Sequence, residues 1–291
     1  MVAEANAKNL KWPKRAHIMT SNMAVVNKEA DWLQRLLGRN TRPPAVPAGR
    51  RVFAVGDIHG RRDLLDRLTG QIRTYGKTAG PAQNTLIFLG DYIDRGPHSK
   101  GVIAYLLELD LPGWEIVFLR GNHDQSLLDF LDDANLYRAW RNFGGAETLL
   151  SYGVMPPRFD DEKAFAKARD ELAQMCPPAH LRFFRDLKNL HQEGDYLFVH
   201  AGIRPGIPIE RQVPEDLLWI RDDFLLSNRL SSRVVVHGHT PAPSPVRRRN
   251  RICLDTGAHA TGCLTAAVLE GEGCTFLATG RATADAVPFL G

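Results

Sequence analysis

The chain has 291 residues, of which 44% are hydrophobic and 24% charged, and its formal net charge is +4. This composition is typical of a globular protein with a sizeable core and argues against a disordered or fibrous chain. The sequence contains no run of 18 or more apolar residues, residues 1–8 lack the apolar segment of a secretory signal, and the four cysteines form no CxxC pair. We therefore expect a cytoplasmic protein with reduced thiols and no membrane partner.

The positive charge is concentrated in an N-terminal arm. Residues 1–51 hold ten Lys or Arg and three acidic residues, a net charge of +7, so the +4 of the whole chain leaves about −3 for residues 52–291. A basic nucleic-acid-binding face on the body is therefore not expected, whereas the arm is a candidate contact for an acidic partner. We predict an arm over 1–49, with a short amphipathic helix at 25–37 and a proline-rich linker at 42–49, and a main domain over 50–291.

Strands and helices alternate after the linker. Apolar runs predict strands at 51–55, 85–89 and 115–119, and each is followed by residues at helical spacing. This βαβ series predicts an α/β fold with parallel strands covered by helices. The stretch 132–190 predicts two or three helices, an insertion packed near the strand ends. Strands return at 196–199, 234–236, 252–254, 264–269 and 274–277, and we expect the last three to be antiparallel because no helical pattern separates them.

Polar side chains follow five of these strands, at the point where each strand ends. The segments are Gly56–Gly60 (GDIHG), Gly90–Gly96 (GDYIDRG), Arg120–Asp124 (RGNHD), His200–Gly202 (HAG) and His237–Thr240 (HGHT). Open α/β sheets place their chemistry beyond the carboxyl ends of the strands, so we expect these side chains in one crevice. Carboxylate, imidazole and amide donors without sulfur suit Mn, Fe or Zn. Six such ligands exceed the needs of one tetrahedral zinc and indicate two metals that share a carboxylate.

These motifs, in this order, resemble the metallophosphoesterases of the phosphoprotein phosphatase (calcineurin-like) family over residues 51–258. The resemblance implies an αββα sandwich, with two central mixed β-sheets flanked by helices, and the helical insertion at 132–190. It also implies two divalent metal ions, with Mn²⁺ favoured and Fe or Zn as alternatives. The implied ligands are Asp57 and His59 for the first ion, Asp91 as the bridge, and Asn122, His200 and His239 for the second.

The resemblance further implies a mechanism. A hydroxide that bridges the metals attacks phosphorus directly, and His123, paired with Asp94, is the general acid that protonates the leaving oxygen. Arg95, Arg120 and Arg221 match phosphate-binding arginines, a role for which the guanidinium is suited. For Arg221 a structural ion pair with Asp222 or Asp223 is the alternative.

The substrate remains open among three hypotheses. The first is a bacterial-type serine/threonine phosphoprotein phosphatase acting on a phosphorylated protein or small phosphoester. The second is a symmetrical diadenosine tetraphosphate hydrolase, which residues 253–265 also resemble; residues 247–251, with four arginines, would hold a polyphosphate or form a solvated basic turn. The third, a non-catalytic phosphoprotein-binding protein, predicts a missing ligand or acid, and every one is present. We expect His259 to line the cleft, and His98, His180 and His191 to be surface residues.

Overall fold

The first sheet carries the three predicted parallel strands. These are β1 (Arg50–Val55), β2 (Gln83–Phe88) and β3 (Glu115–Phe118), which pair in chain order. Helices α2 (Arg62–Thr78) and α3 (Ser99–Glu108) form the crossovers. On the other side of β1, strands β9 (Thr265–Glu270) and β10 (Gly273–Ala278) add antiparallel, giving the order β10-β9-β1-β2-β3. The computed structural model describes residues 42–280.

The second sheet contains β4 (Leu190–Glu193), β5 (Tyr196–Val199), β6 (Val234–His237), β7 (Val246–Arg247) and β8 (Arg251–Cys253), in the order β4-β5-β6-β8-β7. Strands β5, β6 and β8 are parallel. The expectation that residues 252–254 form an antiparallel strand holds for the pairing of β8 with β7 and is wrong for its pairing with β6. The sequence reading missed β7, which runs antiparallel to β8 and thereby reverses the chain between β6 and β8.

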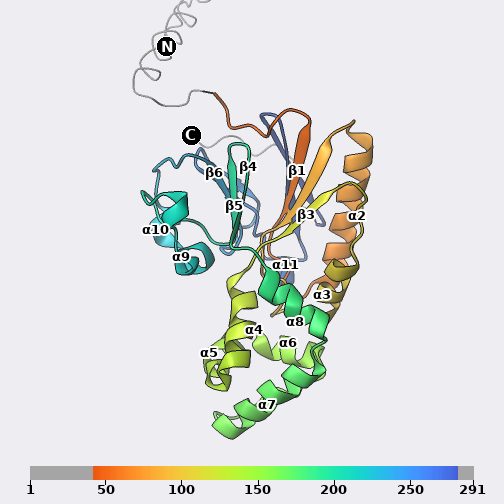
Figure 1. Cartoon of the computed structure of the whole chain (residues 1–291), viewed down its shortest axis with the longest axis vertical. Coiled ribbons are helices and arrows are strands. Elements are labelled where there is room, and N and C mark those ends of the chain that lie inside the picture. The colour runs from red at the N-terminus through yellow and green to blue at the C-terminus, as the bar shows by residue number, and fades with distance from the viewer. Residues whose placement is uncertain (1–41, 281–291) are drawn as a thin grey trace, which may run out of the picture. The chain divides into compact units, whose positions relative to one another are not determined.

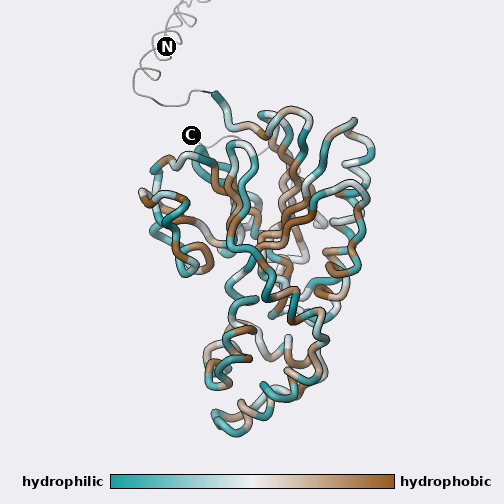
Figure 2. The backbone as a smooth tube through the Cα atoms, in the orientation of Figure 1, coloured by the Kyte–Doolittle hydropathy of each residue, from teal (hydrophilic) through white to brown (hydrophobic). Residues whose placement is uncertain are grey.

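The central strands of both sheets are buried on both faces, which explains their continuous apolar runs. In β1, Val52 and Ala54 face the second sheet, whereas Phe53 and Val55 pack under the helices. The brown strands at the centre of Figure 2 show this concentration of apolar residues. Helices α2 and α3 cover the outer side of the first sheet, and α9 (Pro214–Trp219) and α10 (Asp222–Leu225) that of the second (Figure 1). The architecture is the two-sheet sandwich that the sequence resemblance implied.

The insertion is helical. After α4 (Asn122–Asp132) come two 3₁₀ turns (Ala134–Leu136, Arg141–Phe143) and helices α5 (Tyr137–Trp140), α6 (Gly145–Ser151), α7 (Glu162–Met175) and α8 (Pro178–Asp186). Asp161 caps α7 through the N–H of Lys163, and Pro178 occupies the first turn of α8. These helices lie beyond one end of the sheets (Figure 1). His180, expected at the surface, is buried instead and bonds to the Tyr152 hydroxyl at 2.9 Å.

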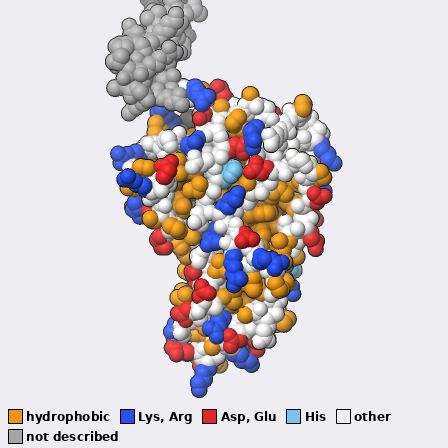
Figure 3. Space-filling view, viewed as in Figure 1, with side chains coloured by type: hydrophobic (Ala, Val, Ile, Leu, Met, Phe, Trp, Pro, Cys, Tyr) orange, Lys and Arg blue, Asp and Glu red, His pale blue; other side chains and the backbone are white. Residues whose placement is uncertain are grey.

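The compact unit that contains both sheets begins at Pro44 and not at residue 50. Val46, expected in a linker, is buried, and its N–H donates to the carbonyl of Gly271. The predicted helix at 25–37 and the basic arm up to residue 41 lie outside the described residues. On the face seen in Figure 3, basic and acidic side chains are intermingled. Within residues 42–280, no helix combines the length and apolar character needed to span a bilayer.

Candidate metal and catalytic site

The structure brings the side chains from the two sheets together at the carboxyl ends of the strands. The oxygen of the Asn122 amide lies 2.8 Å from His200 Nε2 and 2.8 Å from His239 Nδ1. The rings of His59 and His123 are 4.7 Å apart, and those of His200 and His239 are 5.1 Å apart. Asn122 and His123 lie on the first turn of α4 rather than in a loop. All of these residues are buried.

Asp91 stands at the centre of the cluster. Its carboxylate shares one group of donor atoms with His59 and His123 and a second group with His200 and His239, and within each group the atoms lie within 4.8 Å of one another. Two groups that share one carboxylate agree with a pair of cations bridged by Asp91. Asp57, expected to be a ligand, belongs to neither group, and its carboxylate accepts the backbone N–H of His239.

Backbone carbonyls orient two of the imidazoles. His59 Nδ1 lies 2.9 Å from the carbonyl oxygen of Ile93, and His200 Nδ1 lies 2.9 Å from that of Leu89. In each ring the Nδ1 proton is thereby held by a carbonyl, which leaves Nε2 as a lone-pair donor facing the cluster. Metal-binding histidines are commonly fixed in this way by a hydrogen bond at the other ring nitrogen.

The pKa values of these groups favour the binding of a cation. Burial lowers the pKa values of His59, His200 and His239, so the three rings are neutral and able to act as ligands. Burial opposes ionisation of Asp91, but the surrounding imidazoles are protonated at the low pH where this carboxyl titrates, and their positive charge outweighs burial and holds its pKa below the ordinary value. Burial and the nearby Asp91 carboxylate raise the pKa of Asp255 to about 6. Carboxylates crowded in this manner are stabilised by a divalent cation.

The backbone of the site is strained. Within residues 42–280, the non-glycine residues with a positive φ are His59, Asp91, Asp94, Arg95 and His239, at 46°, 54°, 71°, 64° and 66°. Each is a predicted site residue. Left-handed backbone is costly for residues with a Cβ and collects at functional sites, where surrounding contacts enforce it.

Asp124, the last residue of the RGNHD segment, was not predicted to have a role but supports the site. Its carboxylate accepts the backbone N–H groups of Gly121 (2.8 Å), Asp91 (2.9 Å) and Tyr92 (3.1 Å). It therefore ties the start of α4 to the loop after β2. An acidic residue at the third position of a helix is the sequence signal that could have indicated this role.

His123 and Asp94 form the expected pair. His123 Nδ1 lies 2.7 Å from Asp94 Oδ2, so Nδ1–H donates to the carboxylate and Nε2 faces the cleft. Burial lowers the pKa of His123, but Asp91 and the hydrogen-bonded Asp94 outweigh burial and raise it above the ordinary value. The imidazole is therefore able to carry a second proton near neutral pH.

The three predicted phosphate-binding arginines lie in different surroundings. Arg95 is exposed, and its guanidinium lies 3.3 Å from His123 Nε2. Arg221 is also exposed and electrostatically close to His200 and His239, while Asp223, one of its expected alternative partners, pairs with Arg204 at 3.0 Å. The Arg120 guanidinium instead donates to Gln125 and to three carbonyls at the end of α8, those of Phe184, Arg185 and Leu187.

Three further rings border the cluster. The His259 ring lies 5.2 Å from that of His59, as expected for a residue lining the cleft. Phe143 lies 6.0 Å from the rings of both His123 and Trp219, and Trp219 lies 6.3 Å from that of His239. These rings form an aromatic rim beside the acid and the metal ligands.

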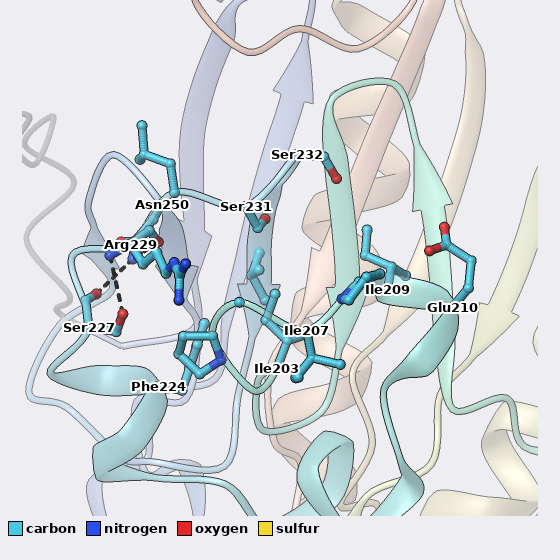
Figure 4. A pocket seen from close by; sticks show the side chains of 15 residues that line it. Ile203, Ile207, Ile209, Glu210, Phe224, Ser227, Arg229, Ser231, Ser232 and Asn250 are labelled. Carbon is cyan, nitrogen blue, oxygen red and sulfur yellow. Dashed lines mark hydrogen bonds between the residues drawn. The ribbon is translucent and has the colours of Figure 1, made fainter. Parts of the chain in front are cut away.

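A cavity of about 350 Å³ lies apart from the cluster, beside β6 (Figure 4). Its walls include Ile203, Ile207, Phe224 and Arg229, and none of the predicted site residues lines it.

The sequence model of the calcineurin-like phosphoesterases matches residues 50–264. The chain belongs to this family. As a calcineurin-like phosphoesterase it is a hydrolase of phosphate esters, and the family implies divalent metal ions at the clustered donors. The donor set described above fits them, because it combines neutral imidazoles, an ionised carboxylate and an amide oxygen.

Among calcineurin-like phosphoesterases, the chain is similar to enzymes with different substrates. It is 30% identical over 227 residues to serine/threonine-protein phosphatase 1 of Salmonella typhimurium, covering 76% of this chain and 93% of that protein. It is 27% identical over 230 residues to the asymmetrical bis(5'-nucleosyl)-tetraphosphatase PrpE of Bacillus thuringiensis, covering 73% of this chain and 87% of that protein. The fold is similar to that of a cold-active protein tyrosine phosphatase, with a TM-score of 0.52 and 16% identity. The match covers 80% of this chain and 78% of that protein.

Proposed function

We propose that the chain is a metal-dependent phosphomonoesterase that hydrolyses phosphoserine and phosphothreonine in proteins. The observation that carries the proposal is the charge distribution around the donor cluster. Arg95 lies beside His123, and Arg221 lies near His239. Together the two guanidinium groups supply enough positive charge to bind one phosphoryl group. A single phosphate ester needs no positive charge beyond that of these two arginines.

The surface next to Arg221 is acidic. A depression of about 370 Å³ there is lined by Glu215, Asp216, Asp222 and Asp223, against Arg204 and Arg221. Arg204 is paired with Asp216 at 2.6 Å and with Asp223 at 3.0 Å. Such a surface repels the additional phosphates of a polyphosphate chain and accommodates a peptide.

The arginine-rich segment at 247–251 does not add to the charge at the site. It joins β7 to the amino end of β8, and β8 runs parallel to β6. The metal-ligand residues follow the carboxyl ends of the strands, so this turn lies at the opposite end of the sheet. Arg251 is buried and donates to the carbonyl of Leu225. These observations favour the structural interpretation of the segment over polyphosphate binding.

Two divalent ions, which we propose to be Mn²⁺, would be held by Asp57, His59 and Asp91 and by Asp91, Asn122, His200 and His239. When bound, they would supply the Lewis acidity that activates water and offsets charge on the phosphoryl oxygens. The protein residues orient the ester. Arg95 and Arg221 hold the phosphoryl oxygens, and His123 Nε2 faces the ester oxygen.

Hydrolysis breaks the bond between phosphorus and the seryl or threonyl oxygen. The oxygen leaves with the bonding electron pair and takes the proton from His123 Nε2, while an oxygen from water replaces it on phosphorus. Asp94 keeps its hydrogen bond to Nδ1–H throughout and stabilises the imidazolium beforehand. A proton from solvent then restores the acid.

A dinucleoside polyphosphate hydrolase is the second candidate, because the match covers 87% of PrpE, close to the 93% covered of the protein phosphatase. PrpE is named for asymmetrical cleavage, whereas residues 253–265 resemble a symmetrical enzyme. Asymmetrical cleavage of diadenosine tetraphosphate gives ATP and AMP, whereas symmetrical cleavage gives two molecules of ADP.

The test compares phosphate release from phosphoserine and phosphothreonine peptides with cleavage of diadenosine tetraphosphate, by Mn²⁺-loaded protein and by His123→Ala. We expect kcat/KM for the peptides to exceed that for the dinucleotide at least tenfold. The reverse ratio would assign the chain to nucleotide hydrolysis, and the nucleotide products would identify the cleavage mode. Turnover of neither substrate by metal-loaded protein would favour the non-catalytic phosphoprotein-binding hypothesis.

A further inference from the structure

The carboxylate of Asp94 is held by the helical insertion as well as by His123. Asp94 is completely buried. Its Oδ2 accepts His123 Nδ1–H at 2.7 Å and the indole N–H of Trp140 at 2.8 Å, and its Oδ1 accepts the Thr148 hydroxyl at 2.6 Å. Trp140 lies on α5 and Thr148 on α6, 46 and 54 positions after Asp94 in the chain.

The same hydroxyl also holds the backbone of Asp94. The N–H of Asp94 donates to Thr148 Oγ1 at 2.9 Å and to Ser99 Oγ at 3.1 Å. Asp94 has a φ of 71°, so its conformation must be enforced by contacts of this kind. Thr148 therefore fixes both the main chain and the carboxylate of the residue that orients His123.

Gly144 allows the insertion to approach this closely, and Gly145 leaves room for Trp140 within the insertion. A Cβ on Gly144 would lie 2.4 Å from the backbone nitrogen of Arg95, and a Cβ on Gly145 would lie 2.4 Å from the Trp140 indole. The N–H of Arg95 donates to the carbonyl of Gly144 at 3.3 Å. The insertion is thus packed against the Asp94–Arg95 segment through backbone as well as side chains.

We propose that Trp140 and Thr148 are positioning residues for the general acid, so that the insertion completes the catalytic site through Asp94. A rotation of the Asp94 carboxylate would leave the buried indole N–H of Trp140 without its acceptor and would break the 2.6 Å hydrogen bond from the Thr148 hydroxyl, which is costly. The carboxylate is therefore restricted to the orientation that receives Nδ1–H and directs Nε2 toward the ester oxygen. The proposal rests on the phosphatase function and on the role of His123 described above.

The test uses the dependence of the rate on the leaving group. A phosphoserine peptide releases a poor leaving group that needs the proton of His123, whereas p-nitrophenyl phosphate releases a good one that needs it little. We expect Trp140→Phe and Thr148→Val to lower kcat for the peptide about 10- to 100-fold, with KM and bound Mn²⁺ within twofold of the parent. The kcat for p-nitrophenyl phosphate should fall less than about threefold.

Two further variants separate positioning from packing. Thr148→Ser keeps the hydroxyl and should restore peptide turnover to within about threefold of the parent. Tyr152→Phe is the matched control, because it removes a buried hydroxyl from the same insertion, one that bonds to His180 and not to Asp94. It should leave the ratio of the two rates unchanged.

Equal losses on both substrates, or losses that follow a lower Tm or a lower metal content, would overturn the positioning role. His123→Ala is run alongside. If it shows the leaving-group dependence and Trp140→Phe and Thr148→Val do not, only this inference fails. If His123→Ala shows no such dependence, the proposed acid is wrong, and the inference falls with it.

Discussion

The backbone N–H of His239 donates to both carboxylate oxygens of Asp57, at 3.0 and 3.2 Å, although the two residues are 182 positions apart. Asp57 follows the first sheet and His239 the second, so this contact joins the two halves of the site. Gly238 makes it possible, because a Cβ there would lie 2.0 Å from Asp57 Oδ1. The site depends on this glycine even though Gly238 carries no ligand atom.

Gly238→Ala should displace the Asp57 carboxylate, weaken metal binding and lower kcat/KM by about 10- to 100-fold, the range for loss of a supporting contact around a metal. Gly70→Ala, on the exposed side of α2, is the matched control because no atom lies within 4 Å of its added Cβ. The control should raise the free energy of unfolding by about 0.5–1 kcal/mol and leave turnover unchanged. Metal titration and kinetics are measured for both variants, and urea unfolding gives the stability of the control. A fully active Gly238→Ala protein would contradict the prediction.

Asp91→Asn keeps the shape of the side chain but removes the charge shared by the two groups of donors. We expect the bound metal to fall and kcat to drop more than about 100-fold, because Asp91 belongs to both groups of donor atoms. Asp66→Asn, which loses only an exposed contact to Arg62, serves as the control. Elemental analysis and phosphate release are the measurements. Unchanged metal content with full activity would exclude the bridging role.

Arg95→Ala and Arg120→Ala should have different effects. Arg95 is exposed beside His123, so its loss should raise KM for a phosphopeptide about tenfold or more with little change in stability. Arg120 holds the carbonyls at the end of α8, so its loss should lower the free energy of unfolding by about 1–3 kcal/mol with KM nearly unchanged. Kinetics and urea unfolding distinguish them. A raised KM for Arg120→Ala at unchanged stability would restore the phosphate-binding role that the sequence predicted.

His180 should make the stability of the protein depend on pH. Burial, with a smaller effect of Lys100, lowers the pKa of His180 below its ordinary value, whereas the unfolded chain binds the proton near pH 6.5. The folded state therefore binds fewer protons than the unfolded chain just below that pH. The stabilisation that comes from the neutral His180 is complete above pH 6.5 and declines as the pH falls toward the lowered pKa.

The measurement is urea unfolding of the parent and His180→Gln at pH 7.5, 6.5 and 5.5. His180→Gln loses the bond to Tyr152 and should be less stable at pH 7.5. The difference in the free energy of unfolding between the two proteins should narrow toward pH 5.5, by no more than about 1.4 kcal/mol per pH unit. A constant or widening gap would show that His180 is not held neutral. The other buried histidines affect both proteins equally and cancel in the comparison.

Local patterns in the sequence were sufficient to predict the alternation of strands and helices and the residues that follow each strand. Both depend on short-range periodicity, because a buried strand and an amphipathic helix each need a characteristic spacing of apolar residues. The carboxyl ends of neighbouring strands meet, so Asp57, Asp91 and Asn122, which follow β1, β2 and β3, could be assigned to one cluster before any distance was known.

Only the tertiary structure decided how those side chains are oriented and supported. Arg120 stands beside a ligand motif in the sequence, yet its guanidinium contacts the carbonyls of α8. Trp140 and Thr148 lie in a helical stretch with no catalytic motif, yet both reach Asp94. The reason is physical: the direction of a side chain depends on the backbone φ and on packing partners far along the chain, and neither is encoded by local periodicity.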